Sequence, residues 1–114
     1  MSTFQNKTVL ITGGASGIGK LMASISLQKG SKVIIWDINT ASITATLSEL
    51  QSLGSIFGYT IDITDLAAVK ATAALVKKEQ GTVDILINNA GIVVGKYFHE
   101  HTHEEIRRTM AINA

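Results

Sequence analysis

The chain has 114 residues, of which 46% are hydrophobic and 17% are charged, and this length and apolar composition indicate one folded domain rather than a disordered chain. A formal net charge of +1 argues against a broad basic surface, so nucleic acid is not an expected partner and any anion must be held locally. The absence of cysteine excludes disulfides and thiolate metal sites, and together with the absence of a membrane-span or signal-peptide pattern it favours a cytoplasmic location.

Four apolar runs of strand length, at residues 8–11, 33–36, 56–61 and 83–87, alternate with segments of helical periodicity. Each helical segment is expected to bury one apolar stripe. The stripes are Ile18, Leu21, Met22 and Ile25, then Ile43, Leu47 and Leu50, then Leu66, Val69, Ala73 and Val76. Glycines are expected at the C-terminal turns of the three helices, at Gly30, Gly54 and Gly81. Apolar strands joined by helices predict an α/β fold with a doubly wound parallel sheet.

A glycine-rich turn at residues 12–19 connects the first strand to the first helix. Gly13 is expected to make the sharp turn, Gly17 to let a pyrophosphate approach the backbone, and Gly19 to let the helix pack against the sheet. The helix start that follows offers backbone N–H groups and a positive dipole end, which suit a phosphate diester. A plain tight connection between strand and helix would also use glycines, so the turn alone is a weak signal.

Asp37 ends the second strand, 18 residues after Gly19. A carboxylate at this place can accept hydrogen bonds from both hydroxyls of an adenosine ribose, and its charge repels a 2′-phosphate. Because Ala15 and Ser16 offer no compensating cation, NAD(H) is favoured over NADP(H). The alternative is that Asp37 only caps a helix or lies on the surface, and Asp62, at the end of the third strand, has the corresponding alternative of a turn residue.

Asn88, Asn89, Ala90 and Gly91 follow the fourth strand. In a sheet of order 3-2-1-4 this loop and the glycine turn line the same crevice, at the point where the strand order reverses. An asparagine amide there can tie the two strand ends together, although a plain turn would have a similar composition.

Together these motifs resemble those of the short-chain dehydrogenases/reductases, and the resemblance runs over the whole chain. It rests on Thr-Gly-x-x-x-Gly-Ile-Gly at residues 12–19, Asn-Asn-Ala-Gly at residues 88–91, and Asn113. The resemblance implies a Rossmann fold in which the pyrophosphate and nicotinamide side is met by Gly13, Ser16, Ile18 and Gly19. It implies further that Asp37 binds the adenosine ribose, that Asp62 and the Ile63 amide hold the adenine edge, and that Asn89, Ala90 and Gly91 cover the remaining ribose and adenosine surface. Asn88 has a structural role by the same resemblance, and Asn113 is the catalytic asparagine that holds a water in the proton relay.

The activity that the resemblance implies is hydride transfer between NAD(H) and a small alcohol or carbonyl compound. The family also uses a serine and a Tyr-x-x-x-Lys pair, whereas here Tyr59 is followed four residues later by Ile63, and Tyr97 by His101. We therefore expect residues 1–114 to be the N-terminal, dinucleotide-binding part of such an enzyme, inactive alone and prone to self-association as a homo-oligomer. Two alternatives stay open: a noncatalytic dinucleotide sensor, and a truncated product that acts by associating with another chain.

The last part of the chain carries two weaker signals. Thr102 and Glu105 form a capping-box pattern that predicts the start of a fourth helix, within which the chain ends. His99, His101 and His103 lie before it without a neighbouring acidic or cysteine cluster, so we interpret them as a solvated turn and predict no metal site.

Overall fold

The computed structural model describes residues 3–90 of the chain. Its strands are β1 (Thr8–Thr12), β2 (Lys32–Asp37), β3 (Ile56–Thr60) and β4 (Ile85–Asn88). Its helices are α1 (Gly17–Gln28), α2 (Thr40–Leu50) and α3 (Leu66–Gln80), with a short 3-10 helix, η1, at Gln51–Leu53. All strand pairs are parallel and the sheet order is β3-β2-β1-β4, which confirms the predicted doubly wound fold and strand order. Gly91, the three histidines, the expected fourth helix and Asn113 lie outside the described residues.

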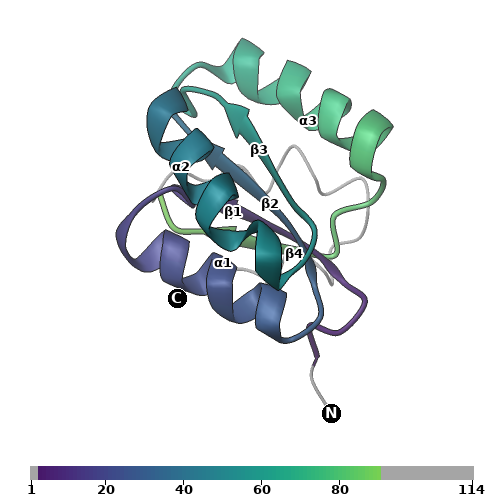
Figure 1. The fold of residues 1–114 in the computed structure, drawn as a ribbon. Helices are drawn as coiled ribbons and strands as arrows, with labels where there is room; N and C mark the ends of the chain where they lie inside the picture. The colour runs from purple at the N-terminus through teal and green to yellow at the C-terminus, as the bar shows by residue number, and fades with distance from the viewer. Residues whose placement is uncertain (1–2, 91–114) are drawn as a thin grey trace.

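Helices α1 and α2 cover one face of the sheet and α3 covers the other (Figure 1). Alternate strand residues point to opposite faces, so each inner strand supplies apolar side chains to both layers. The α1/α2 layer packs on Val9, Ile11, Val33, Ile35, Ile85 and Ile87. The α3 layer packs on Leu10, Ile34, Trp36 and Leu86. The outer strand β3 is only half-buried, because it lies at the edge of the sheet.

The face that α1 turns toward the sheet differs from the predicted one, although Met22 of the predicted stripe is partly buried against the core. Ile18, Leu21 and Ile25 are 69%, 59% and 42% exposed, and the buried residues of α1 are Gly19, Ala23, Ser26 and Leu27. These four share a helix face because they are spaced by about one turn. The close approach of α1 to the glycine turn selects a face of small residues near its start. In α3, Leu66 is likewise exposed, whereas Val69, Ala73 and Val76 are buried as predicted; in α2, Ile43 and Leu50 are also buried as predicted.

The strand register brings the carboxyl ends of the four strands to one edge of the sheet. Thr12 of β1 lies opposite Trp36 of β2 on one side and opposite Asn88 of β4 on the other. The chain leaves β1 through α1 toward β2, while β4 pairs with the other side of β1, so the strand order reverses between β1 and β4. Ligands of open α/β sheets bind in the crevice outside such a reversal. Among residues 3–90, no helix is long and apolar enough to cross a membrane.

Candidate functional site

The glycine turn is attached to β2 before it leads into α1. The amides of Gly13 and Gly14 donate to the Trp36 carbonyl oxygen, at 2.7 and 3.4 Å. Gly13 has a φ of +67°, a conformation that favours glycine, so the turn begins at Gly13 as predicted. Gly14, which sequence reasoning passed over, lies so close to Ile35 that a Cβ at this position would overlap its side chain. Gly14 therefore allows the turn to lie against the sheet.

Gly17 and Gly19 differ in what surrounds them. Gly17 has a φ of +55°, and a Cβ added to it would meet no atom within 4 Å, so open space lies beside the backbone there. A Cβ on Gly19 would overlap the carbonyl of Gly13 and lie 2.8 Å from Nδ2 of Asn89. The expected role of Gly19 in helix-to-sheet packing is thus corrected: its missing side chain lets the first turn of α1 lie against the glycine turn and the loop after β4.

The start of α1 has no side-chain cap. Ser16 occupies the N-cap position with an extended backbone, and its hydroxyl makes no capping hydrogen bond. By contrast, Asn39 accepts from the Ser42 amide at 2.9 Å at the start of α2, and Asp65 accepts from the Ala68 amide at 3.1 Å at the start of α3. Of the three α-helices in residues 3–90, α1 alone leaves its first amides without a side-chain acceptor. Such amides, at the positive end of the helix dipole, can bind an anionic group.

Asp37 reaches back from the end of β2 to the glycine turn. Its Oδ2 accepts from the Ala15 amide at 3.1 Å, and its Oδ1 accepts from the Asn39 amide at 3.1 Å. Because Asn39 caps α2, the alternative in which Asp37 is the helix cap is wrong. Asp37 is half-buried, so it is neither a plain surface residue nor enclosed. Its carboxylate is held beside the turn.

Asp62 is exposed and forms a tight turn with Thr64. Its Oδ1 accepts from the Thr64 amide at 2.9 Å and from the Thr64 hydroxyl at 2.6 Å. These two hydrogen bonds, the hydroxyl one first, lower the pKa of the Asp62 carboxyl because they stabilise its charged form. Asp62 is therefore a turn residue in this structure, as the second interpretation of the sequence predicts.

A cavity of about 350 Å³ lies among the residues that are predicted to bind the adenosine half of the cofactor. Five predicted site residues line it: Gly13, Asp37, Asp62, Ile63 and Ala90. Its other lining residues are Trp36, Ile38, Ile61 and Thr64, which were not predicted. Each of these four adjoins a predicted residue in the sequence, and the ends of β2 and β3 bring them to the same place. Ser16, Gly17, Ile18 and Gly19 do not line this cavity and lie at the start of α1.

Hydrogen bonds tie the end of β4 to the glycine turn, as expected for an asparagine pair there. The Thr12 hydroxyl donates to Oδ1 of the buried Asn88 at 3.1 Å and accepts from the Ala90 amide at 3.1 Å. Nδ2 of Asn89 donates to the Gly13 carbonyl oxygen at 3.3 Å. The two loops that flank the strand-order reversal are therefore held as one unit.

Tyr59 is the tyrosine that falls within the described residues, and it lies in the outer strand β3, opposite Trp36 of β2, with its hydroxyl directed to Glu79 of α3. Burial raises the pKa of its phenol, and the hydrogen bond that its hydroxyl donates to Glu79 at 2.6 Å raises the pKa further. An acid/base tyrosine working near neutral pH needs the opposite shift. Tyr59 is therefore a structural contact between β3 and α3.

Comparison with known proteins points to one family. The sequence profile described as short chain dehydrogenase matches residues 7–114. The chain is 40% identical to human epidermal retinol dehydrogenase 2 over 107 residues, which cover 92% of the chain and 35% of that protein. It is 42% identical to a short chain dehydrogenase/reductase of Gibberella zeae over 93 residues, which cover 82% of the chain and 34% of that protein.

The fold agrees with a solved structure of the same kind. The crystal structure of a short chain dehydrogenase/reductase from Burkholderia phymatum in complex with NAD superposes with a TM-score of 0.70 at 29% identity. The match covers 75% of this chain and 31% of that one. The chain thus spans about a third of the length of these relatives.

Proposed function

The chain belongs to the short chain dehydrogenase family, and from this premise we propose that it forms the NAD(H)-binding part of an oxidoreductase acting on a small alcohol or carbonyl compound. The observation that carries the proposal is the uncapped start of α1 at the strand-order reversal, in a turn whose Gly13 lines the cavity and whose Ala15 amide donates to Asp37. When bound, the nicotinamide accepts or donates the hydride. The residues of this chain bind and orient the dinucleotide.

The start of α1 fits a pyrophosphate. The backbone amides at Gly17, Ile18 and Gly19 are the first of the helix, and the open space beside Gly17 lets an anion come close to them. Backbone donors and the helix dipole supply the positive potential, so a chain with a net charge of +1 needs no basic patch for this purpose. Lys20, a basic side chain in the first turn of α1, is paired with Glu49 at 2.5 Å.

The cavity beside Asp37 fits the adenosine half. Asp37 uses each carboxylate oxygen for one backbone amide, and each oxygen retains a lone pair for a ribose hydroxyl. A phosphate on the ribose 2′ position would bring two negative charges together there. Ile38, Ile61 and Ile63 line the same cavity, and their side chains offer the adenine ring an apolar contact. We therefore propose NAD(H) as the cofactor.

Catalysis belongs to the full-length protein under this proposal. Asn113, assigned by the family resemblance, holds a water of the proton relay, and the serine and the Tyr-x-x-x-Lys pair are not in residues 1–114. Residues 1–114 alone bind the dinucleotide without turnover, because hydride transfer needs a positioned proton partner worth about 10²–10⁴-fold in rate. A cytoplasmic homo-oligomer is part of the same proposal.

The test is a fluorescence titration of the full-length protein with NADH and with NADPH. NADH is expected to bind at least about tenfold more tightly. Asp37→Ala is expected to weaken NADH binding by about 10–100-fold, because hydrogen bonds to a charged group contribute about 1.5–3 kcal/mol, and to weaken NADPH binding less. Asp65→Ala, which removes a carboxylate at the same edge but outside the cavity, is the matched control. Equal binding of NADH and NADPH that Asp37→Ala leaves unchanged would contradict the cofactor assignment.

A further inference from the structure

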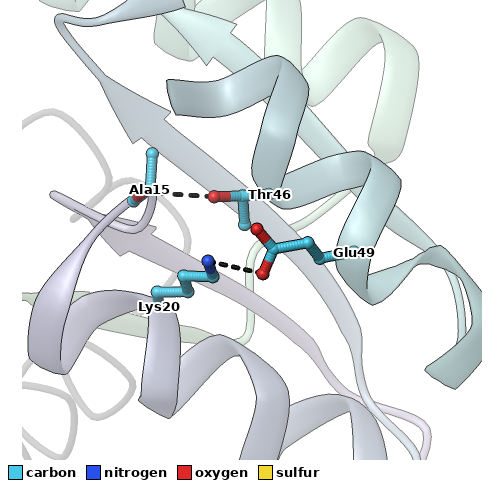
Figure 2. A network of polar contacts seen from close by, with 4 residues as sticks. All are labelled: Ala15, Lys20, Thr46 and Glu49. Carbon is cyan, nitrogen blue, oxygen red and sulfur yellow. Dashed lines mark hydrogen bonds and ion pairs between the residues drawn. The ribbon is translucent and has the colours of Figure 1, made fainter. Parts of the chain in front are cut away.

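Thr46 reaches from the middle of α2 to the glycine turn. Its side chain is 1% exposed, and its hydroxyl donates to the Ala15 carbonyl oxygen at 3.2 Å, across 31 positions of sequence (Figure 2). The amide of the same residue, Ala15, donates to Asp37 at 3.1 Å. Both polar backbone groups of Ala15 are therefore held, one by the end of β2 and the other by α2.

The hydrogen bond from Thr46 to the Ala15 carbonyl oxygen also sets the orientation of the Ser16 amide. A peptide unit is planar and trans, so its C=O and the following N–H point in opposite directions. When Thr46 fixes the Ala15 carbonyl toward α2, it also fixes the Ser16 N–H to point away from α2. Ser16 is exposed and stands directly before the open start of α1. The orientation of this amide is thus set by a side chain on another helix.

A second contact, one turn further along α2, joins α2 to α1. Nζ of Lys20 in α1 pairs with Oε2 of Glu49 in α2 at 2.5 Å, next to the Thr46 contact (Figure 2). Their side chains are 33% and 54% exposed, and exposed ion pairs add little to stability. The buried hydroxyl of Thr46 is the stronger constraint, because a buried carbonyl that loses its donor is costly.

We propose that Thr46 is a positioning residue for the pyrophosphate of NAD(H), acting through the Ala15–Ser16 peptide. This inference rests on the proposed function, since it assigns a residue on α2 to the phosphate-binding turn. It separates two contributions to affinity: Asp37 contacts the ribose, whereas Thr46 orients the backbone that meets the diphosphate and touches no ligand.

The test compares ADP, which carries a diphosphate, with adenosine, which carries none, by calorimetric titration of the full-length protein. Thr46→Val removes the hydroxyl at nearly constant volume and is expected to weaken ADP and NADH binding by about tenfold, the equivalent of one neutral hydrogen bond. Adenosine binding is expected to change by less than about twofold. Thr46→Ser keeps the hydroxyl and should restore ADP affinity. Thr44→Val is the matched control, because the Thr44 hydroxyl donates to Thr40 within α2 and does not contact the turn.

The possible results are distinct. A wild-type protein that binds neither ADP nor NADH would overturn the proposed function, and the inference with it. A wild-type protein that binds both, with a Thr46→Val variant whose ADP affinity is unchanged, would overturn only the inference. Equal losses for ADP and adenosine would show a structural role instead. If Thr46→Val does not fold by circular dichroism, the smaller Thr46→Ala takes its place; failure of both to fold would also overturn the positioning role.

Discussion

The starts of α1 and α3 stand at the same edge of the sheet but are built differently. Asp65 closes the start of α3 by accepting the Ala68 amide, whereas Ser16 leaves the start of α1 open. An N-cap side chain contributes about 1 kcal/mol to helix stability, so the open start is a local cost. Serine is a good capping residue type, and its hydroxyl is nevertheless not used here. The comparison teaches that residue type gives the capacity to cap, while the backbone of the preceding turn decides whether the cap forms.

The turn before α1 is also more constrained than the one before α3. Gly13, Gly14 and Gly19 pack against backbone or core atoms with no room for a Cβ at Gly14 or Gly19. The turn before α3 is instead stabilised by the side chain of Asp62 bonded to Thr64. The turn before α1 also uses its own amides, at Gly13, Gly14 and Ala15, within the fold, so the open amides are those of the first turn of α1 that follows it.

The largest effect is expected at the open start. In Gly19→Ala the added Cβ overlaps the Gly13 carbonyl, so the first turn of α1 must move and its amides lose their alignment. We expect NADH affinity to fall about 100-fold, because each amide hydrogen bond lost to the charged pyrophosphate costs about 1.5–3 kcal/mol. Fluorescence titration of the full-length protein measures the change.

Gly81→Ala serves as the control for that substitution. Gly81 has a φ of +86° but no atom within 4 Å of an added Cβ, so alanine there introduces strain without a clash. We expect a loss of about 1–2 kcal/mol in the free energy of unfolding and unchanged NADH affinity. A Gly19→Ala variant that binds NADH as tightly as Gly81→Ala does would contradict the claim that the open start of α1 binds the cofactor.

A smaller effect is expected at the closed start. Asp65→Ala removes the α3 cap and is expected to lower the free energy of unfolding by about 1 kcal/mol, while NADH affinity stays within about twofold. Urea unfolding and the same titration measure the two quantities. Loss of NADH binding without loss of stability would mean that the α3 start, rather than the α1 start, meets the ligand.

The smallest effect concerns the charge of Asp62. Its lowered pKa means that the Asp62–Thr64 turn favours the folded state above the ordinary pKa of 3.8, and that this contribution disappears as pH falls through the lowered value. Thr64→Val removes the hydroxyl donor and keeps the amide, so the pKa should rise part of the way toward 3.8. A carbon-13 NMR titration of the carboxyl group measures it. An unchanged Asp62 pKa in this variant would show that the Thr64 hydroxyl is not the main cause of the lowered pKa.

Much of this architecture was predictable from the sequence, because periodicity and strand-length apolar runs depend on local spacing. Periodicity predicts the buried stripes of α2 and most of α3, whereas the order 3-2-1-4 and the Asn88 contact with β1 follow from the known topology of doubly wound sheets. The buried face of α1 was not, because hydrophobicity points to Ile18, Leu21 and Ile25, while close packing against the glycine turn requires Gly19 and Ala23.

In the candidate site, too, some features follow from the sequence and others depend on the three-dimensional packing. The positions of Gly13 and Asp37 follow from their place at strand ends, whereas the choice between Asp37 and Asn39 as the α2 cap depends on backbone direction that sequence does not give. Thr46 carried no sequence signal, because its role arises from a contact 31 positions away in the chain.

The most direct test of the central claim is a nitrogen-15 NMR titration of the isotope-labelled full-length protein with NAD⁺. The account predicts that the amide signals of Gly17, Ile18 and Gly19 shift in proportion to ligand bound, because these groups meet the pyrophosphate. It also predicts that the Ser42 and Ala68 amides, which already donate to Asn39 and Asp65, do not shift. Saturable binding that shifts the capped amides and leaves those of α1 in place would contradict the account.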